Sequence, residues 1–116
     1  KTSDIAKKIA LSLVSSNEFE LMTLVAQLSD SKKEFSSMLK IFSSILRDVM
    51  ILLAKASVAD ANDCAKTLSE KLSMKQVLNL IDIIHCTKDY VEKNVNLSNV
   101  TTFFCSNLFK ISNRNL

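Results

Sequence analysis

The sequence has 116 residues, a formal net charge of +3, and neither glycine nor proline. About fourteen glycines and prolines would be expected at average usage. Because tight β-hairpins depend on glycine, the absence of both residues excludes a hairpin-rich fold. It predicts helices joined by short polar links. The length suits one domain that buries a core without disulfides or metal, and we expect residues 1–116 to form a single helical domain.

Charge and cysteine content narrow the class of protein further. The lysines are scattered, so the mildly basic charge does not indicate nucleic-acid or membrane binding. No apolar run approaches the roughly 18 residues that span a bilayer. Three widely spaced cysteines do not resemble a disulfide framework and favour a reducing, intracellular setting. Because the sequence begins with Lys1, we expect a segment of a longer polypeptide.

Two short helices are predicted first, over residues 4–14 and 18–28. Ser3 or Asp4 is a suitable N-cap for the first helix, and Asn17 for the second. The inward residues expected in the first helix are Ile5, Ile9 and Leu13. The inward residues expected in the second are Phe19, Met22, Val25 and Ala26.

The longest predicted helix begins at Ser31, which has capping-box spacing to Glu34, and ends near Ala56. Its apolar residues recur at heptad spacing, at Phe35, Met38, Phe42, Ile45, Val49, Leu52 and Ala56. A second row, Leu39, Leu46 and Leu53, widens the stripe to the width of a bundle helix. The off-stripe residues are core by default, or a protein-binding patch if they are exposed: Ile41, Met50 and Ile51.

Arg47 and Asp48 interrupt the most apolar part of this helix. One interpretation is that they mark a narrow exposed side, past which long side chains can reach water. The other is that they pair with groups on another helix or another subunit, because buried charges need partners. The residues alone leave both interpretations open.

Three more helices are predicted over residues 61–72, 74–93 and 97–111. Ser73 and Gln76 have capping-box spacing, and Asn96 is a good N-cap for the last helix. The expected core residues are Cys64, Ala65, Leu68 and Leu72, then Met74, Val77, Leu78, Ile81 and Ile84 with Leu80, Ile83 and Val91 beside them, then Val100, Phe103, Phe104, Leu108 and Ile111. The prediction is therefore an all-α, irregular bundle of about six helices.

No residue pattern supports catalysis or a bound cofactor. His85 is the single histidine and has no further ligands at metal-binding spacing. Cys86 follows it directly, and neighbouring helical residues point about 100° apart, so the two do not form a nucleophile pair. Without glycine there is no glycine-rich phosphate loop. We therefore expect no enzyme active site, cofactor, metal or small-molecule ligand in this segment.

Three features occur in an order that suggests a family. LRDVMIL lies at residues 46–52, KLSMKQVLNLIDII at 71–84, and NVN at 94–96, followed by an amphipathic helix. This arrangement resembles the C-terminal domain of the delta-prime subunits of bacterial DNA polymerase III, which belong to the clamp loader. The resemblance spans roughly residues 5–111. Leu97, Asn99 and Thr102 depart from the family pattern, where proline, leucine and an acidic residue are frequent, so the related gamma/tau and delta subunits remain alternatives.

The resemblance implies a bacterial, cytoplasmic collar domain. Such domains pack side by side with those of other clamp-loader subunits, in a ring that holds together the AAA+ ATPase-type modules loading the sliding clamp on primed DNA. Those modules would lie outside residues 1–116, and contact with DNA would be indirect. The family motif matches Arg47, Asp48, Asn94 and Asn96, for which the resemblance implies structural roles.

Two other functions are compatible with the sequence. A free-standing adaptor would dock a partner's amphipathic helix in a groove between two helices. A helical nucleic-acid binder would lose affinity steeply with added salt, but the scattered lysines make this the weaker interpretation. An open apolar groove would favour the adaptor, and an ATPase-like module encoded upstream of Lys1 would favour the clamp loader.

Overall fold

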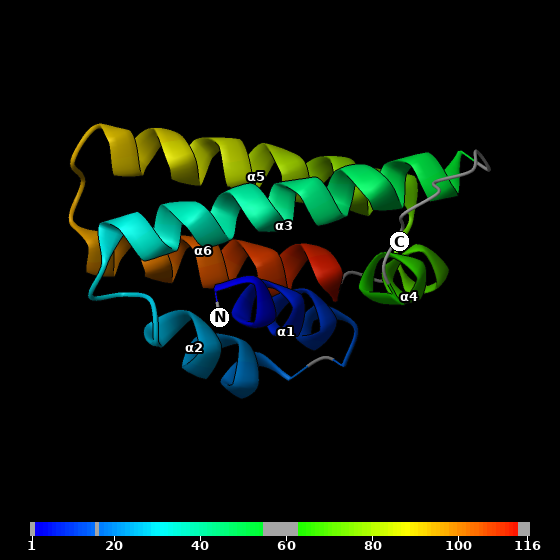
Figure 1. The fold of residues 1–116 in the computed structure, drawn as a ribbon, viewed down its shortest axis with the longest axis horizontal. Helices are drawn as coiled ribbons and strands as arrows, with labels where there is room; N and C mark the ends of the chain where they lie inside the picture. The colour runs from blue at the N-terminus through cyan, green and yellow to red at the C-terminus, as the bar shows by residue number, and fades with distance from the viewer. Residues whose placement is uncertain (1, 16, 55–62, 114–116) are drawn as a thin grey trace.

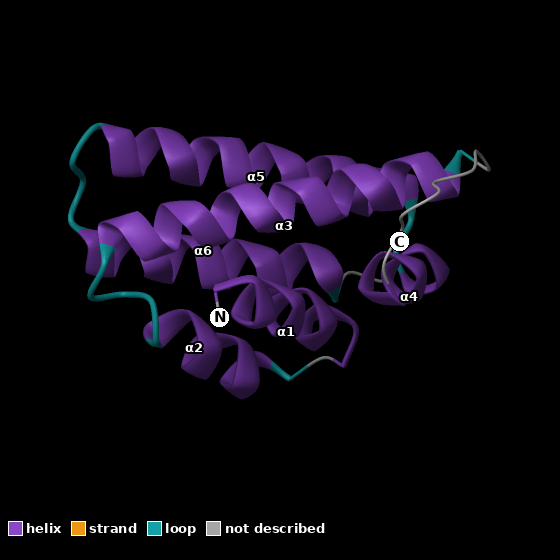
Figure 2. Cartoon of the chain, viewed as in Figure 1, coloured by secondary structure: helices purple, strands orange, loops and turns teal. Residues whose placement is uncertain are grey.

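The computed structural model describes residues 2–15, 17–54 and 63–113. Over these residues it contains six α-helices and no strand (Figure 1 and Figure 2). The helices are α1 (Thr2–Ser15), α2 (Glu18–Ala26), α3 (Lys32–Leu53), α4 (Asp63–Lys71), α5 (Met74–Glu92) and α6 (Leu97–Ser112). The predicted all-α class is confirmed. The predicted helix end at Ala56 and the start at residue 61 lie outside the described residues.

The longest helix, α3, packs against three of the other helices. α5 runs antiparallel beside it, and α1 and α4 also contact it. α6 packs against α5 and α2, and α2 packs against α1. In Figure 1, α5 lies along the top edge of the molecule and α2 along the bottom, so these two helices occupy opposite sides of α3.

The core is built on the predicted stripe of α3. Its buried residues are Phe35, Met38, Leu39, Phe42, Ile45, Leu46 and Val49. Phe104 of α6 packs edge-on against two of these rings, with centroids 5.6 Å from Phe35 and 6.3 Å from Phe42. All three rings are fully buried, so this aromatic cluster joins α3 to α6 at the centre of the bundle.

Four of the predicted N-caps are confirmed. The amide of Glu34 donates to Ser31 Oγ over 3.2 Å, and Ser73 forms a complete capping box with Gln76. Asn17 and Asn96 cap α2 and α6. The prediction for the first helix is wrong, because α1 begins at Thr2 and places Ser3 and Asp4 inside its first turn, where the Asp4 carboxylate favourably meets the helix dipole.

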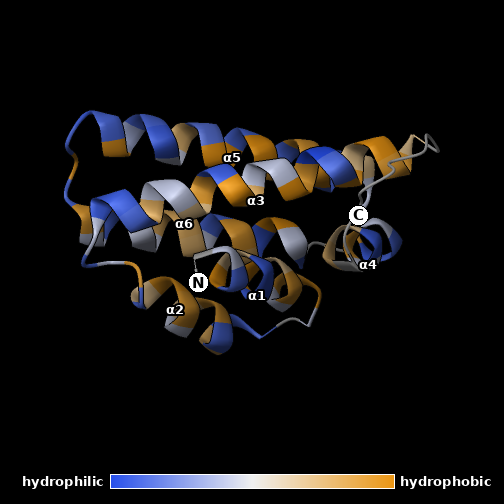
Figure 3. Cartoon of the chain, viewed as in Figure 1, coloured by the Kyte–Doolittle hydropathy of each residue, from blue (hydrophilic) through white to orange (hydrophobic). Residues whose placement is uncertain are grey.

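The inward face of α2 is also predicted wrongly. The helix buries Leu21, Leu24 and Val25, whereas Phe19 and Met22 are 81% and 54% exposed. Ala26, also expected inside, is exposed. Figure 3 shows the reason: α2 is hydrophobic over much of its surface, so two apolar stripes compete and periodicity alone does not choose between them.

α2 ends earlier than predicted, at Ala26 rather than Leu28. Residues 27–30 continue as turns, in which the amides of Leu28 and Ser29 donate to carbonyl groups three residues earlier. This tighter winding turns Leu28 into the core, where it is 2% exposed.

The buried face of α5 is rotated by part of a helical turn from the predicted face. The helix buries two residues of its predicted main face, Val77 and Ile84, and two of the residues predicted beside it, Leu80 and Val91. The other main-face residues Met74 and Leu78 are instead 37% and 47% exposed. Thr87 is buried as well, and its hydroxyl donates to the carbonyl oxygen of Ile83 over 2.7 Å. A polar residue enters the core because its own helix satisfies its hydrogen bond.

Candidate functional site

Arg47 and Asp48 lie on the outer part of α3. Arg47 is exposed and Asp48 is half-buried. The described part of the chain contains one ion pair, between Lys93 and Asp89 at 3.0 Å. Neither Arg47 nor Asp48 therefore has a charged partner among the described residues. The structure thus places Arg47 at the surface of α3, as the first of the two interpretations expects. Pairing with another subunit stays a prediction.

The off-stripe residues of α3 divide into two groups. Ile41 and Met50 are half-buried and pack against the core. Ile51 is 38% exposed. The structure therefore does not gather the three into one exposed patch, and only Ile51 remains a candidate contact for a partner.

The NVN sequence forms the turn between α5 and α6. Asn94 has a φ of 61°. Its backbone amide donates to the carbonyl oxygen of Val91, and the amide of Val95 donates to the carbonyl oxygen of Tyr90. These two hydrogen bonds form a Schellman motif at the end of α5. Asparagine tolerates this left-handed conformation better than most residues. Asn94 Oδ1 also accepts a hydrogen bond from Lys32 Nζ, linking the turn to the start of α3.

Asn96 performs the second task in this turn. Its Oδ1 accepts hydrogen bonds from the amides of Ser98, at 2.9 Å, and Asn99, at 3.4 Å, and so caps α6. The two asparagines therefore end one helix and begin the next within three residues. Through these hydrogen bonds the two asparagines hold the turn between α5 and α6 and link it to the start of α3.

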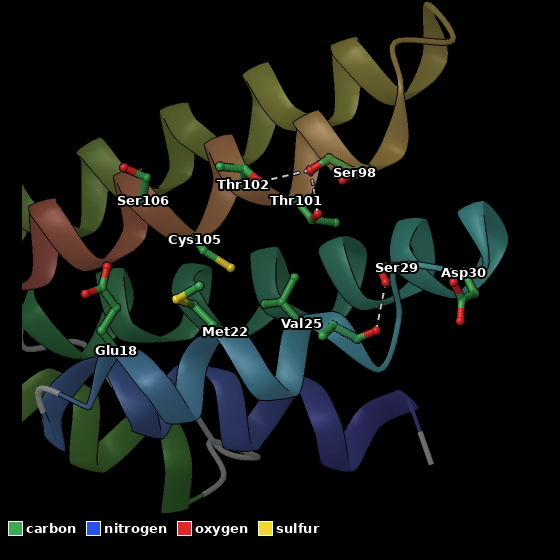
Figure 4. A pocket seen from close by; sticks show the side chains of 11 residues that line it. Glu18, Met22, Val25, Ser29, Asp30, Ser98, Thr101, Thr102, Cys105 and Ser106 are labelled. Atoms are coloured by element: carbon green, nitrogen blue, oxygen red, sulfur yellow. Dashed lines mark hydrogen bonds between the residues drawn. The ribbon is translucent and has the colours of Figure 1, made fainter.

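An open groove of about 510 Å³ lies between α2 and α6. Its apolar lining consists of Met22, Val25 and Ala26 from α2 and Cys105 from α6. Figure 4 shows Met22 and Cys105 directed toward one another across it. Phe19, which is 81% exposed and so the most exposed large apolar residue of the described part of the chain, lies on the same short helix. Sequence reasoning missed this site because it placed Phe19 and Met22 in the core.

The polar rim of the groove is acidic and rich in hydrogen-bond acceptors. Glu18 lies at one end and Asp30 at the other, and no basic side chain is among the described residues that line it (Figure 4). Thr101 and Thr102 donate their hydroxyl hydrogens to the carbonyl oxygen of Ser98, at 2.9 and 3.0 Å. The oxygen lone pairs of these hydroxyls are left to accept hydrogen bonds from a ligand.

The thiol of Cys105 is held neutral in the wall of this groove. Burial raises its pKa from an ordinary value of 9.0 to about 11, and the negative charge of Glu18 across the groove adds to the rise. Burial also raises the pKa of Cys64, partly offset by Lys7. A thiol with a raised pKa is a poor nucleophile, so Cys105 contributes apolar surface to the groove rather than reactivity.

A second, smaller hollow lies between α3 and α5 and includes Arg47 and His85 in its lining. The described residues contain no group of three or more histidine, cysteine or acidic side chains that could hold a metal ion. Among the helices of the described segments, none combines the length and the apolarity needed to cross a membrane. We take the groove between α2 and α6, of about 510 Å³, as the candidate functional site.

Comparison with known proteins finds no matching family model, no matching curated protein and no matching solved structure.

Proposed function

We propose that this chain is an assembly domain that seats a helix of a neighbouring subunit in the groove between α2 and α6. The observation that carries the proposal is the open groove of about 510 Å³, flanked by a helix on which Phe19 and Met22 remain 81% and 54% exposed. A contiguous exposed apolar surface beside a groove is typical of a protein-binding site.

The chemistry of the groove defines its occupant. An apolar floor requires a stripe of apolar side chains, and the acidic ends formed by Glu18 and Asp30 favour lysine or arginine at both ends of that stripe. The wall formed by α2 has nine residues, so about 2.5 turns of a partner helix would lie along it. The occupant is therefore a short amphipathic helix with basic ends.

The identity of the neighbour rests on the family resemblance. The order of LRDVMIL, the KLSMKQ helix start and NVN resembles that of clamp-loader collar domains. In this chain the NVN element forms the tight turn in which Asn94 follows the end of α5 and Asn96 caps α6. We infer that the neighbour is the helical domain of a sister subunit of DNA polymerase III. In that role the domain supports loading of the sliding clamp on primed DNA during replication, without catalysis or a small-molecule ligand of its own.

A free-standing adaptor is the second candidate, because the same groove would receive an amphipathic helix of an unrelated partner. A collar domain of the gamma/tau or delta type is a variant of the first proposal. The coding sequence upstream of Lys1 separates these functions. An AAA+ module there supports the clamp loader, and a different neighbouring module supports the adaptor.

The direct test mixes the chain with the C-terminal helical domains of the delta and gamma/tau subunits from the same organism. We expect at least one mixture to elute from a sizing column as a complex, because the groove would be covered. An unrelated helical domain of similar size serves as the control and should elute separately. Unchanged elution with every sister domain would count against the clamp-loader proposal.

A further inference from the structure

The hollow between α3 and α5 is basic. It has a volume of about 190 Å³ and a floor formed by Leu39 and Ile84, which are 1% and 2% exposed. Its walls carry four basic side chains, two from each helix: Lys40, Arg47, His85 and Lys88. Ser43 completes the lining, and no acidic residue is among the described residues that form it.

The two lysines and the arginine of this hollow have no acidic partner within the described part of the chain. Lys40, Arg47 and Lys88 form no ion pair there, and Asp89, which follows Lys88, is bound to Lys93. Asp48 follows Arg47, but neighbouring helical side chains point about 100° apart. Three cations at one small hollow repel one another, so the site favours an anionic group supplied from outside.

The basic hollow continues into an apolar surface. Met74, Leu78 and Ile81 precede His85 and Lys88 at spacings of three and four residues, so they share one face of α5. On α3, Ile51 follows Arg47 by four residues. Because the two helices are antiparallel, both apolar segments lie toward the same end of the seam. We name this combined surface, basic at one end and apolar at the other, the α3/α5 face.

The apolar half of the α3/α5 face decides the kind of partner. Leu78 is 47% exposed, and Met74 and Ile51 are 37% and 38% exposed. A nucleic-acid backbone would neutralise the lysines but leave these side chains in water, because its contacts are made chiefly through charge. A protein helix with acidic residues at one end of its stripe and leucine, isoleucine or methionine at the other would cover both halves.

We propose that the α3/α5 face is a second docking surface, which receives an acidic amphipathic helix of a protein partner. This inference rests on the proposed function as an assembly domain. The groove between α2 and α6 has acidic ends, and α2 and α5 lie along opposite edges of the molecule (Figure 1). The domain therefore presents an acidic groove and a basic surface, which fit partner helices of opposite charge.

Two synthetic helical peptides test the proposal independently of any natural partner. They share one leucine stripe, and one carries glutamates at an end of that stripe where the other carries lysines. In an NMR titration of the ¹⁵N-labelled chain, we expect the acidic peptide to shift amides along the α3/α5 face. The basic peptide should instead shift amides of α2 and α6.

Charge reversal provides the matched comparison. The double variant Lys40→Glu/Lys88→Glu should lose at least tenfold in affinity for the acidic peptide, with binding of the basic peptide unchanged. Lys8→Glu/Lys66→Glu makes the same change in net charge at exposed positions of α1 and α4, and it should retain most of the affinity. An equal loss in both double variants would overturn the inference, because general attraction would then explain binding.

The outcomes also separate this inference from the proposed function. Failure of the acidic peptide to shift the α3/α5 face, while sister domains still co-elute with the chain, overturns the second docking surface alone. Peptide binding at the predicted face without any co-elution supports the surface and counts against the clamp-loader neighbours.

Discussion

Replacing Phe104 with alanine is expected to lower the free energy of unfolding by about 3–5 kcal/mol. The ring is fully buried and packs edge-on against Phe35 and Phe42, at centroid distances of 5.6 and 6.3 Å. Its removal leaves a cavity between α3 and α6 that the two remaining rings cannot fill without leaving their packed positions. Urea denaturation followed by circular dichroism measures the decrease in the free energy of unfolding. In thermal denaturation the same variant should melt on the order of 10–20 °C lower than the wild type.

Phe19→Ala is the matched control for this prediction. The same ring is removed from a side chain that is 81% exposed, so the free energy of unfolding should change by less than about 0.5 kcal/mol. Equal destabilisation by the two variants would show that Phe19 belongs to the core. That result would contradict both the packing of α2 and the exposed apolar surface beside the groove.

Cys105 is expected to react with iodoacetamide at pH 8 about 100-fold more slowly in the folded chain than in the urea-unfolded chain. Its pKa rises from 9.0 to about 11 on folding, through burial first and the Glu18 charge second. Two pKa units reduce the fraction of reactive thiolate about 100-fold. Mass spectrometry of the labelled peptides measures the rate for each cysteine separately.

Cys86 is the internal control, because it is exposed in the folded chain and should be labelled rapidly. Labelling of Cys105 as fast as Cys86 under native conditions would contradict the structure of the groove wall.

The raised pKa of Cys105 also predicts how the free energy of unfolding depends on pH. The unfolded chain loses the Cys105 proton first, so this contribution to stability is complete below pH 9.0 and is lost as the pH rises toward about 11.

Local chemistry explains which parts of the fold were predictable. Ser31, Ser73 and Asn96 were identifiable as N-caps because each bonds backbone amides two or three residues later, an interaction that depends only on neighbours in sequence. The core stripe of α3 was predictable because its apolar residues repeat regularly over 22 residues. A long, strongly periodic helix leaves only one face on which to pack.

Short or uniformly apolar helices were less predictable. α2 has nine residues and two competing stripes, and the contacts with α1 and α6 decide that Leu21 and Leu24 are buried rather than Phe19 and Met22. The predicted face of α5 was shifted because Thr87, a polar residue, takes a core position. In both helices the tertiary contacts choose the buried side.

The candidate site could not be predicted for a related reason. The groove joins Met22 to Cys105, residues far apart in sequence, and it exists only because α6 returns to lie against α2. The basic hollow likewise depends on α3 and α5 meeting in one register. Arg47 was identified from sequence because it interrupts an apolar run, but its neighbours in the hollow, Lys40 and Lys88, carried no such signal.

The most direct test of the account is the affinity of the chain for a sister-subunit domain, measured by calorimetry before and after Met22→Glu. Met22 is 54% exposed in the groove, so the variant should fold normally and lose tenfold or more in affinity, about 1.4 kcal/mol. Leu11→Glu places the same charge on α1 at a side chain that is 39% exposed and should bind like the wild type. Unchanged affinity in Met22→Glu would contradict the claim that a partner helix occupies the groove between α2 and α6.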